Sequence, residues 1–151
     1  ETFRPFAPSV LLTEAARHFD LDHPSPFMLE TCAVRSPLEL PAITHVDGSA
    51  RVQTVDPAAA PRFAALLAAF ARRTGCPLLV NTSFNVKDEP IVCSPLDALR
   101  CFVDAGLDAL VLEDFVVERA AISAGLKDAV RSRRSLARRE SALSTVLYTF
   151  V

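Results

Sequence analysis

The strongest pattern in the chain is PLLVNTSFNVKDEPIV at residues 77–92. Its apolar start predicts a buried strand. Four small polar side chains follow this strand directly: Asn81, Thr82, Ser83 and Asn85. Ligands of open α/β sheets bind at the carboxyl ends of strands, and hydroxyls and amides hydrogen-bond a phosphate without adding negative charge. One interpretation is therefore a phosphate or nucleotide site, and the other is a set of Asx and Ser/Thr turns.

Helices and strands alternate around this stretch. A single apolar stripe predicts a helix over residues 57–73, which Gly75 stops at the usual C′ position. The stripe consists of Phe63, Leu66, Leu67 and Phe70. Ser94 as N-cap, followed by Pro95, predicts a second helix, and strands are expected at 109–112 and 115–117. This order of elements predicts an α/β fold.

The first 55 residues carry weaker patterns. Residues 3–12 predict a strand whose prolines favour an edge position. Asp47-Gly48 lies between two apolar runs and predicts a hairpin of residues 42–46 with 50–55. Shorter patterns indicate a helix at 13–19 and a strand at 27–34.

Composition narrows the class of protein. The chain has 151 residues, half of them apolar, and a net charge of −2. That size fits one domain, and that charge gives no case for a nucleic-acid partner. No apolar run approaches the ~20 residues that span a membrane, so we expect no membrane partner and a cytoplasmic location. The sequence starts with Glu1 rather than Met, and we expect a piece of a longer protein.

The cysteines and histidines do not form a metal-binding pattern. The cysteines are scattered among apolar neighbours without a C-x-x-C pair, at Cys32, Cys76, Cys93 and Cys101. We expect them to be buried, reduced thiols. No histidine combines with them at zinc spacing, so no structural metal is expected. His18 and His23 are interpreted as surface residues.

Residues 120–151 differ from the rest of the chain. They combine an apolar end with a cluster of arginines, Arg131, Arg133, Arg134, Arg138 and Arg139. A helix docked on the domain and a poorly ordered tail both fit this pattern. The arginines favour a solvated helix face over a nucleic-acid site, because no aromatic residues are interleaved with them.

Three segments together resemble a known family. They are FRPFAPSV at 3–10, ITHVDGSARVQTV at 43–55 and NTSFNVKDEPIV at 81–92. In this order they look like the C-terminal domain of the nodulation-type and antibiotic-biosynthesis O-carbamoyltransferases. The resemblance covers residues 1–119, and the tail at 120–151 lies outside it.

The resemblance implies a fold and an activity. The fold would be YrdC-like, a twisted mixed sheet with packed helices. The domain would bind ATP, with Mg²⁺, and carbamoyl phosphate, and would make carbamoyl-adenylate with release of pyrophosphate. A sugar-kinase-like N-terminal domain of the same protein, which carries its own metal, would then transfer the carbamoyl group to a hydroxyl of a small molecule. The acceptor is not readable from this chain.

The resemblance also implies site residues. Ser83 and Asn85 match the S-x-N half of a bipartite signature, and the K-x-R half is expected just before Glu1. Adenylate formation needs cations beside the phosphates, and we assign that role to Arg4 and Arg51. Without the resemblance, both arginines fit exposed strand residues. Three further residues complete the expected site: Asn81 and Thr82 shape the pocket, and His45 contacts a phosphate or carbamoyl group.

Two observations keep alternatives open. His45 also fits a satisfied strand histidine. Asp88 stands where the family usually has Gly, which would permit a positive φ, and its carboxylate adds negative charge to a proposed phosphate site. A catalytically silent nucleotide-binding or docking module is therefore the main rival. Another YrdC-like activity, such as threonylcarbamoyl-adenylate formation, fits less well with the first two segments. No P-loop or G-x-G-x-x-G is present.

Overall fold

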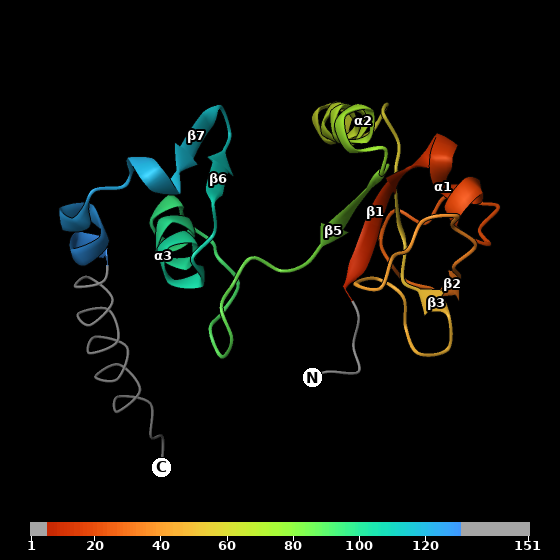
Figure 1. Cartoon of the computed structure of the whole chain (residues 1–151), viewed down its shortest axis with the longest axis horizontal. Coiled ribbons are helices and arrows are strands. Elements are labelled where there is room, and N and C mark those ends of the chain that lie inside the picture. The colour runs from red at the N-terminus through yellow and green to blue at the C-terminus, as the bar shows by residue number, and fades with distance from the viewer. Residues whose placement is uncertain (1–5, 131–151) are drawn as a thin grey trace, which may run out of the picture. The chain divides into compact units, whose positions relative to one another are not determined.

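The computed structural model describes residues 6–130, and the chain divides into two compact units. Residues 1–82 belong to the first unit and residues 83–151 to the second (Figure 1). Each unit has its own hydrophobic core. Arg4 and the arginines after residue 130 lie outside the described residues.

The first unit is built on a three-stranded sheet. β1 (Ala7–Leu11) lies in the middle, between β4 (Gln53–Val55) and β5 (Leu78–Asn81). β1 pairs parallel to β4 and antiparallel to β5. The expected α/β class with a mixed sheet is therefore confirmed.

The central position of β1 contradicts the predicted edge position. Pro8 lies opposite Val80 of β5, whereas pairing with β4 begins only at Ser9. Proline lacks the N–H that a central strand donates. Because β4 has no partner for Pro8, the missing donor breaks no bond of the β1–β4 ladder.

Helices and loops cover both faces of this sheet. α2 (Pro61–Thr74) places Ala64 and Leu67 against one face, in a cluster with Leu11, Val55 and Leu79. Val10 and Leu78 point to the opposite face, because side chains alternate along a strand. They pack in a second cluster with residues of α1 (Leu12–His18) and of the following loop, including Ala15, Phe19 and Leu21.

The predicted hairpin around Asp47-Gly48 is wrong in its pairing. The turn forms, with Gly48 at φ 80 and its N–H donating to the carbonyl of His45. However, β3 (Ser49–Ala50) pairs with β2 (Cys32–Ala33), and residues 42–46 contain no strand. A local turn signal therefore located the turn but not the partner strand.

The second unit combines a helix with a hairpin. α3 (Pro95–Ala105) packs on β6 (Ala109–Leu112), which pairs antiparallel with β7 (Phe115–Glu118). The core contains Phe102, Leu110 and Ile122. Ile122 follows a short 3₁₀ helix, Arg119–Ala121, and residues 124–130 are helical.

Two general properties can be stated for residues 6–130. Among their helices, none has the length and apolar character that crossing a bilayer requires.

Cys101 is buried, Cys32 and Cys76 are half-buried against the first core, and Cys93 is exposed. The prediction of buried thiols is therefore wrong for Cys93.

The N-cap of α3 offers a test of this local structure. The hydroxyl of Ser94 donates to Asp97 Oδ2 at 2.6 Å and accepts from the Asp97 N–H at 3.2 Å. The donated hydrogen bond also lowers the pKa of Asp97. Ser94→Ala should reduce the free energy of unfolding of this unit by about 1 kcal/mol. Hydrogen exchange of the slowest α3 amides measures the loss. Ser94→Thr keeps the hydroxyl, and an equal loss in that variant would argue against the cap.

Candidate functional site

The side-chain amide of Gln53 connects all three strands of the first sheet. Its Oε1 accepts hydrogen bonds from Ser9 Oγ at 2.6 Å and from Asn81 Nδ2 at 2.7 Å. Its Nε2 donates to the carbonyl of Pro26 at 3.2 Å. Because the amide accepts on one side and donates on the other, its orientation is determined by its partners. Asn81, in turn, must present its carbonyl oxygen away from Gln53.

The three residues of this network share one face and one end of the sheet. Ser9, Gln53 and Asn81 lie two residues from Leu11, Val55 and Leu79 respectively, so they point to the face that α2 covers. β5 runs antiparallel to the other two strands, so its carboxyl end lies beside their amino ends. Ser9, Gln53 and Asn81, which are far apart in the sequence, therefore meet at this end.

Ser9 and Gln53 were not expected to belong to the site. Ser9 is fully buried, and Gln53 is half-buried. Ser9 lies between Pro8 and Val10 in β1, and Gln53 follows Val52 at the start of β4. A buried polar side chain needs a partner, and a serine within the apolar run of β1 is the signal in the sequence that would have identified Ser9.

A double-mutant cycle tests the network. Gln53→Leu leaves the buried Ser9 hydroxyl without its acceptor, which should cost about 1–3 kcal/mol of unfolding free energy. In a Ser9→Ala background, the same change should cost clearly less, because that orphaned donor is gone. Urea unfolding followed by the amide signals of β1 gives all four values. Additive costs would show that the two side chains do not depend on each other.

The loop after β5 exposes two hydroxyls. Thr82 and Ser83 are both exposed, and neither side chain makes a hydrogen bond within residues 6–130. They are adjacent in sequence, although Thr82 belongs to the first unit and Ser83 to the second. A hydroxyl can donate to a phosphate or carbonyl oxygen, so these two remain available to a ligand.

Asn85 has a structural role in the same loop. Its Nδ2 donates to the carbonyls of Val86 and Glu89, both at 3.2 Å. The Val92 N–H donates to the Phe84 carbonyl at 2.9 Å and closes the loop, and Phe84 packs on the second core. Of the two interpretations of this stretch, the turn is therefore the one that applies to the Asn85 amide nitrogen, which donates only within the loop. Its Oδ1 has no partner in the described part of the chain.

Asp88 adopts a positive φ of 65. The sequence departure suggested this conformation, because glycine at this position would allow it without strain. Asp tolerates the left-handed region better than most residues. The turn therefore keeps its shape, and an exposed carboxylate is added to the loop.

The backbone conformation of Asp88 can be tested by exchange of the Val92 amide, whose hydrogen bond to Phe84 closes the loop. Asp88→Val should weaken loop closure by about 1–2 kcal/mol, because a β-branched residue is strained at positive φ. Asp88→Gly should not weaken it. Lys87→Val is the matched control, since Lys87 is exposed and has no positive φ. Equal acceleration of exchange in both valine variants would contradict the assignment.

The other expected site residues lie apart from the Gln53 network. Arg51 is exposed and stands two residues before Gln53, on the chain that enters β4. Arg4 lies outside the described residues. The hydrogen bonds and the charged neighbour of His45 all lie within its own turn: its N–H donates to the Ser49 carbonyl, its carbonyl accepts from Gly48, and its Nδ1 lies 3.2 Å from Asp47 Oδ1.

Asp47 is the most perturbed acid near these residues. Hydrogen bonds from the hydroxyl and N–H of Ser49, with a smaller contribution from His45, lower its pKa to about 2. The carboxylate is exposed and stays ionised at neutral pH. It holds the turn through Ser49 and lies beside His45, which favours a structural role for this pair.

His18 and His23 behave differently from each other. His23 is exposed, as expected, and its ring nitrogens lie 2.9 Å from Asp22 and 2.8 Å from Glu30. His18 was also expected on the surface, but only 2% of it is exposed. It lies on the face of α1 that turns towards the rest of the first unit, which the short helix pattern did not reveal. Within residues 6–130, no group of three or more His, Cys, Asp or Glu is arranged to hold a metal ion.

Comparison with known proteins gives consistent results. The family model "Carbamoyltransferase C-terminus" matches residues 1–119. An uncharacterized protein from Synechocystis is 49% identical, over 80% of this chain and 23% of the relative. The nodulation protein NolO from Bradyrhizobium diazoefficiens is 44% identical, over 79% of this chain and 23% of NolO. A 3′-hydroxymethylcephem-O-carbamoyltransferase from Amycolatopsis lactamdurans is 38% identical, over 80% of this chain and 23% of that enzyme. The chain thus spans less than a quarter of the length of these relatives.

Proposed function

Since this chain belongs to the carbamoyltransferase C-terminus family, we propose that it forms carbamoyl-adenylate from ATP and carbamoyl phosphate. The protein that carries it would use this intermediate to carbamoylate a hydroxyl of a small molecule. The names of the relatives support the overall transfer, because two cephem relatives are called O-carbamoyltransferases. The acceptor hydroxyl, the metal of the transfer step and a sugar-kinase-like partner domain would belong to the rest of that protein.

The observation that supports this proposal is that Ser9, Gln53 and Asn81 converge at one end of the first sheet. The Gln53 network positions Asn81 at the end of β5, and the exposed hydroxyls of Thr82 and Ser83 follow directly. Donors without negative charge suit the oxygens of a nucleotide phosphate. Arg51 at the entrance to β4, Arg4 ahead of β1 and Lys87 in the loop would supply positive charge.

The proposed step has a definite atom balance. Water releases inorganic phosphate from carbamoyl phosphate and leaves carbamate. A carbamate oxygen then attacks the α-phosphorus of ATP, and the bond to the bridging oxygen of the β-phosphate breaks, which releases pyrophosphate. Mg²⁺ commonly binds nucleotide phosphates with few protein ligands. The chain's own residues would bind the phosphates, orient the carbamate and neutralise charge.

The structure suggests separate roles for the two halves of the S-x-N motif. The Ser83 hydroxyl would donate to a phosphate or carbamate oxygen. The nitrogen of the Asn85 amide holds the turn, so only its oxygen remains, which would accept from the NH₂ of the carbamoyl group. A Lys-x-Arg element ahead of Glu1 would add the remaining cations.

The test uses the full protein that carries this chain. Ser83→Ala should slow carbamoyl-phosphate-dependent pyrophosphate release by about 10²–10³, the usual loss for one donor to developing charge. Ser83→Thr should retain much of the rate, because it keeps the hydroxyl. Ser123→Ala is the matched control, since it removes a hydroxyl of the same unit outside the loop. Unchanged release in Ser83→Ala would refute the assignment of this residue.

A catalytically silent nucleotide-binding or docking module is the rival function. The exposed Asp88 carboxylate favours it, because a like charge beside a phosphate weakens binding. The same assay separates the two functions. If the unaltered full protein binds ATP but releases no pyrophosphate with carbamoyl phosphate, the module is correct.

A further inference from the structure

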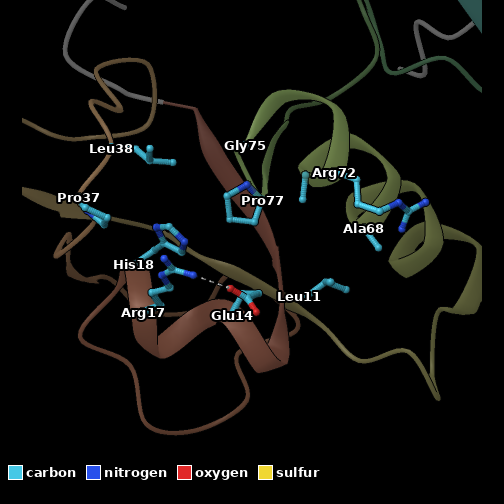
Figure 2. Close-up of a pocket in the computed structure, with 11 residues that line it drawn as sticks. Leu11, Glu14, Arg17, His18, Pro37, Leu38, Ala68, Arg72, Gly75 and Pro77 are labelled. Atoms are coloured by element: carbon cyan, nitrogen blue, oxygen red, sulfur yellow. Dashed lines mark ion pairs between the residues drawn. The ribbon is translucent and has the colours of Figure 1, made fainter.

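A pocket in the first unit lies away from the Gln53 network. It has a volume of about 440 Å³ and is bounded by α1, the loop at 37–38, the second half of α2 and Pro77 (Figure 2). This volume lies within the range of small-molecule sites. Most of its wall is apolar and consists of Leu11, Pro37, Leu38, Ala68, Ala71 and Pro77. Of these residues, only Leu11 also belongs to the hydrophobic cluster between α2 and the sheet.

His18 lines this pocket and carries a buried, unpaired polar atom. Its Nδ1 lies 2.8 Å from Ser36 Oγ, whereas its buried Nε2 has no hydrogen-bond partner in the described part of the chain. Ser36 Oγ also accepts from the Leu38 N–H at 3.1 Å, and no other acceptor for its hydroxyl hydrogen is present among residues 6–130. Since Oγ already accepts from Leu38, we assign the Ser36 hydroxyl hydrogen to Nδ1 of His18.

The tautomer of His18 follows from this hydrogen bond. Burial, with a further contribution from the charge of Arg17, lowers the pKa of His18, so the ring is neutral at physiological pH. A neutral imidazole that accepts at Nδ1 carries its proton at Nε2. The ring thus presents an unsatisfied N–H donor. Buried donors of this kind are uncommon in folded proteins and call for an acceptor.

The charged residues of the pocket carry a net positive charge. Arg17 and Arg72 line it together with one acid, Glu14. Arg17 Nη1 lies 4.0 Å from Glu14 Oε2, which is a long and exposed contact (Figure 2). Arg72 has no ion-pair or hydrogen-bond partner among residues 6–130. Two arginines against one glutamate leave a surplus of one positive charge, which suits a monoanion better than a dianion.

We propose that this pocket binds a small organic carboxylate, with its apolar body against α2 and Pro77. One carboxylate oxygen accepts from the Nε2–H of His18, and the arginines balance the charge. Nε2 is buried in the structure, so this contact would require a shift of the pocket wall. This site is separate from the carbamoyl-adenylate site proposed above, so neither proposal depends on the other.

The experiment uses the protein that carries this chain, labelled with ¹⁵N, and three probes. They are benzoate, its neutral analogue benzyl alcohol, and the dianionic analogue phenyl phosphate. Benzoate should shift the amide signals of the pocket residues saturably and move the Nε2–H signal of His18 downfield, because that proton gains an acceptor. Benzyl alcohol should bind about tenfold more weakly, as expected when a hydrogen bond to a charged group is lost.

Two arginine variants provide the matched comparison. Arg72→Gln should weaken benzoate binding severalfold, whereas Arg73→Gln should not change it, because Arg73 is an exposed neighbour on α2 that does not line the pocket. Both changes lie on the surface, so the fold is retained. The proposal is overturned by equal effects of the two variants, by benzyl alcohol binding as well as benzoate, by tighter binding of phenyl phosphate, or by no saturable shift.

Discussion

The hydrogen bonds of one amide, that of Gln53, join the three strands of the first sheet. Ser9 and Asn81 come from strands that residues 12–77 separate in the sequence. Both side chains donate to Oε1 of Gln53. A glutamate at position 53 would add a negative charge. An apolar residue would leave the fully buried Ser9 hydroxyl without an acceptor. The amide suits this place because Oε1 accepts twice while Nε2 is held by Pro26. The end of β5, and hence the start of the polar loop, is positioned by this arrangement.

Local signals in the sequence predicted local structure well. Gly75 ends α2 in the left-handed conformation at φ 76, and Ser94 caps α3, as their residue types indicate. These outcomes depend on interactions across a few residues. The strand pairings were not predictable in the same way, since nothing in residues 42–55 specifies that β3 joins β2 and that β4 joins β1. Pairing is decided by which apolar faces the whole unit can bury.

The same distinction applies to the site. The run from Asn81 to Asn85 was found because its polar residues are consecutive. Ser9, Gln53 and the buried His18 were missed because each belongs to no run of polar site residues, and only the tertiary structure supplies its partner. The loop also combines both of the original interpretations. Asn85 makes a turn, whereas the hydroxyls of Thr82 and Ser83 have no partner among residues 6–130, so neighbouring residues differ in their availability to a ligand.

The topology of the first sheet has a consequence for how the chain folds. Ser9 and Gln53 are separated by 44 positions, and β1 cannot complete its second ladder until β5 exists. Contacts of such high sequence separation are slow to form, because loop closure precedes any gain from pairing. During synthesis, β1 can therefore complete its pairing with β5 only after Asn81 has left the ribosome. The α3 and β6–β7 segment, whose contacts are local, is free of this delay.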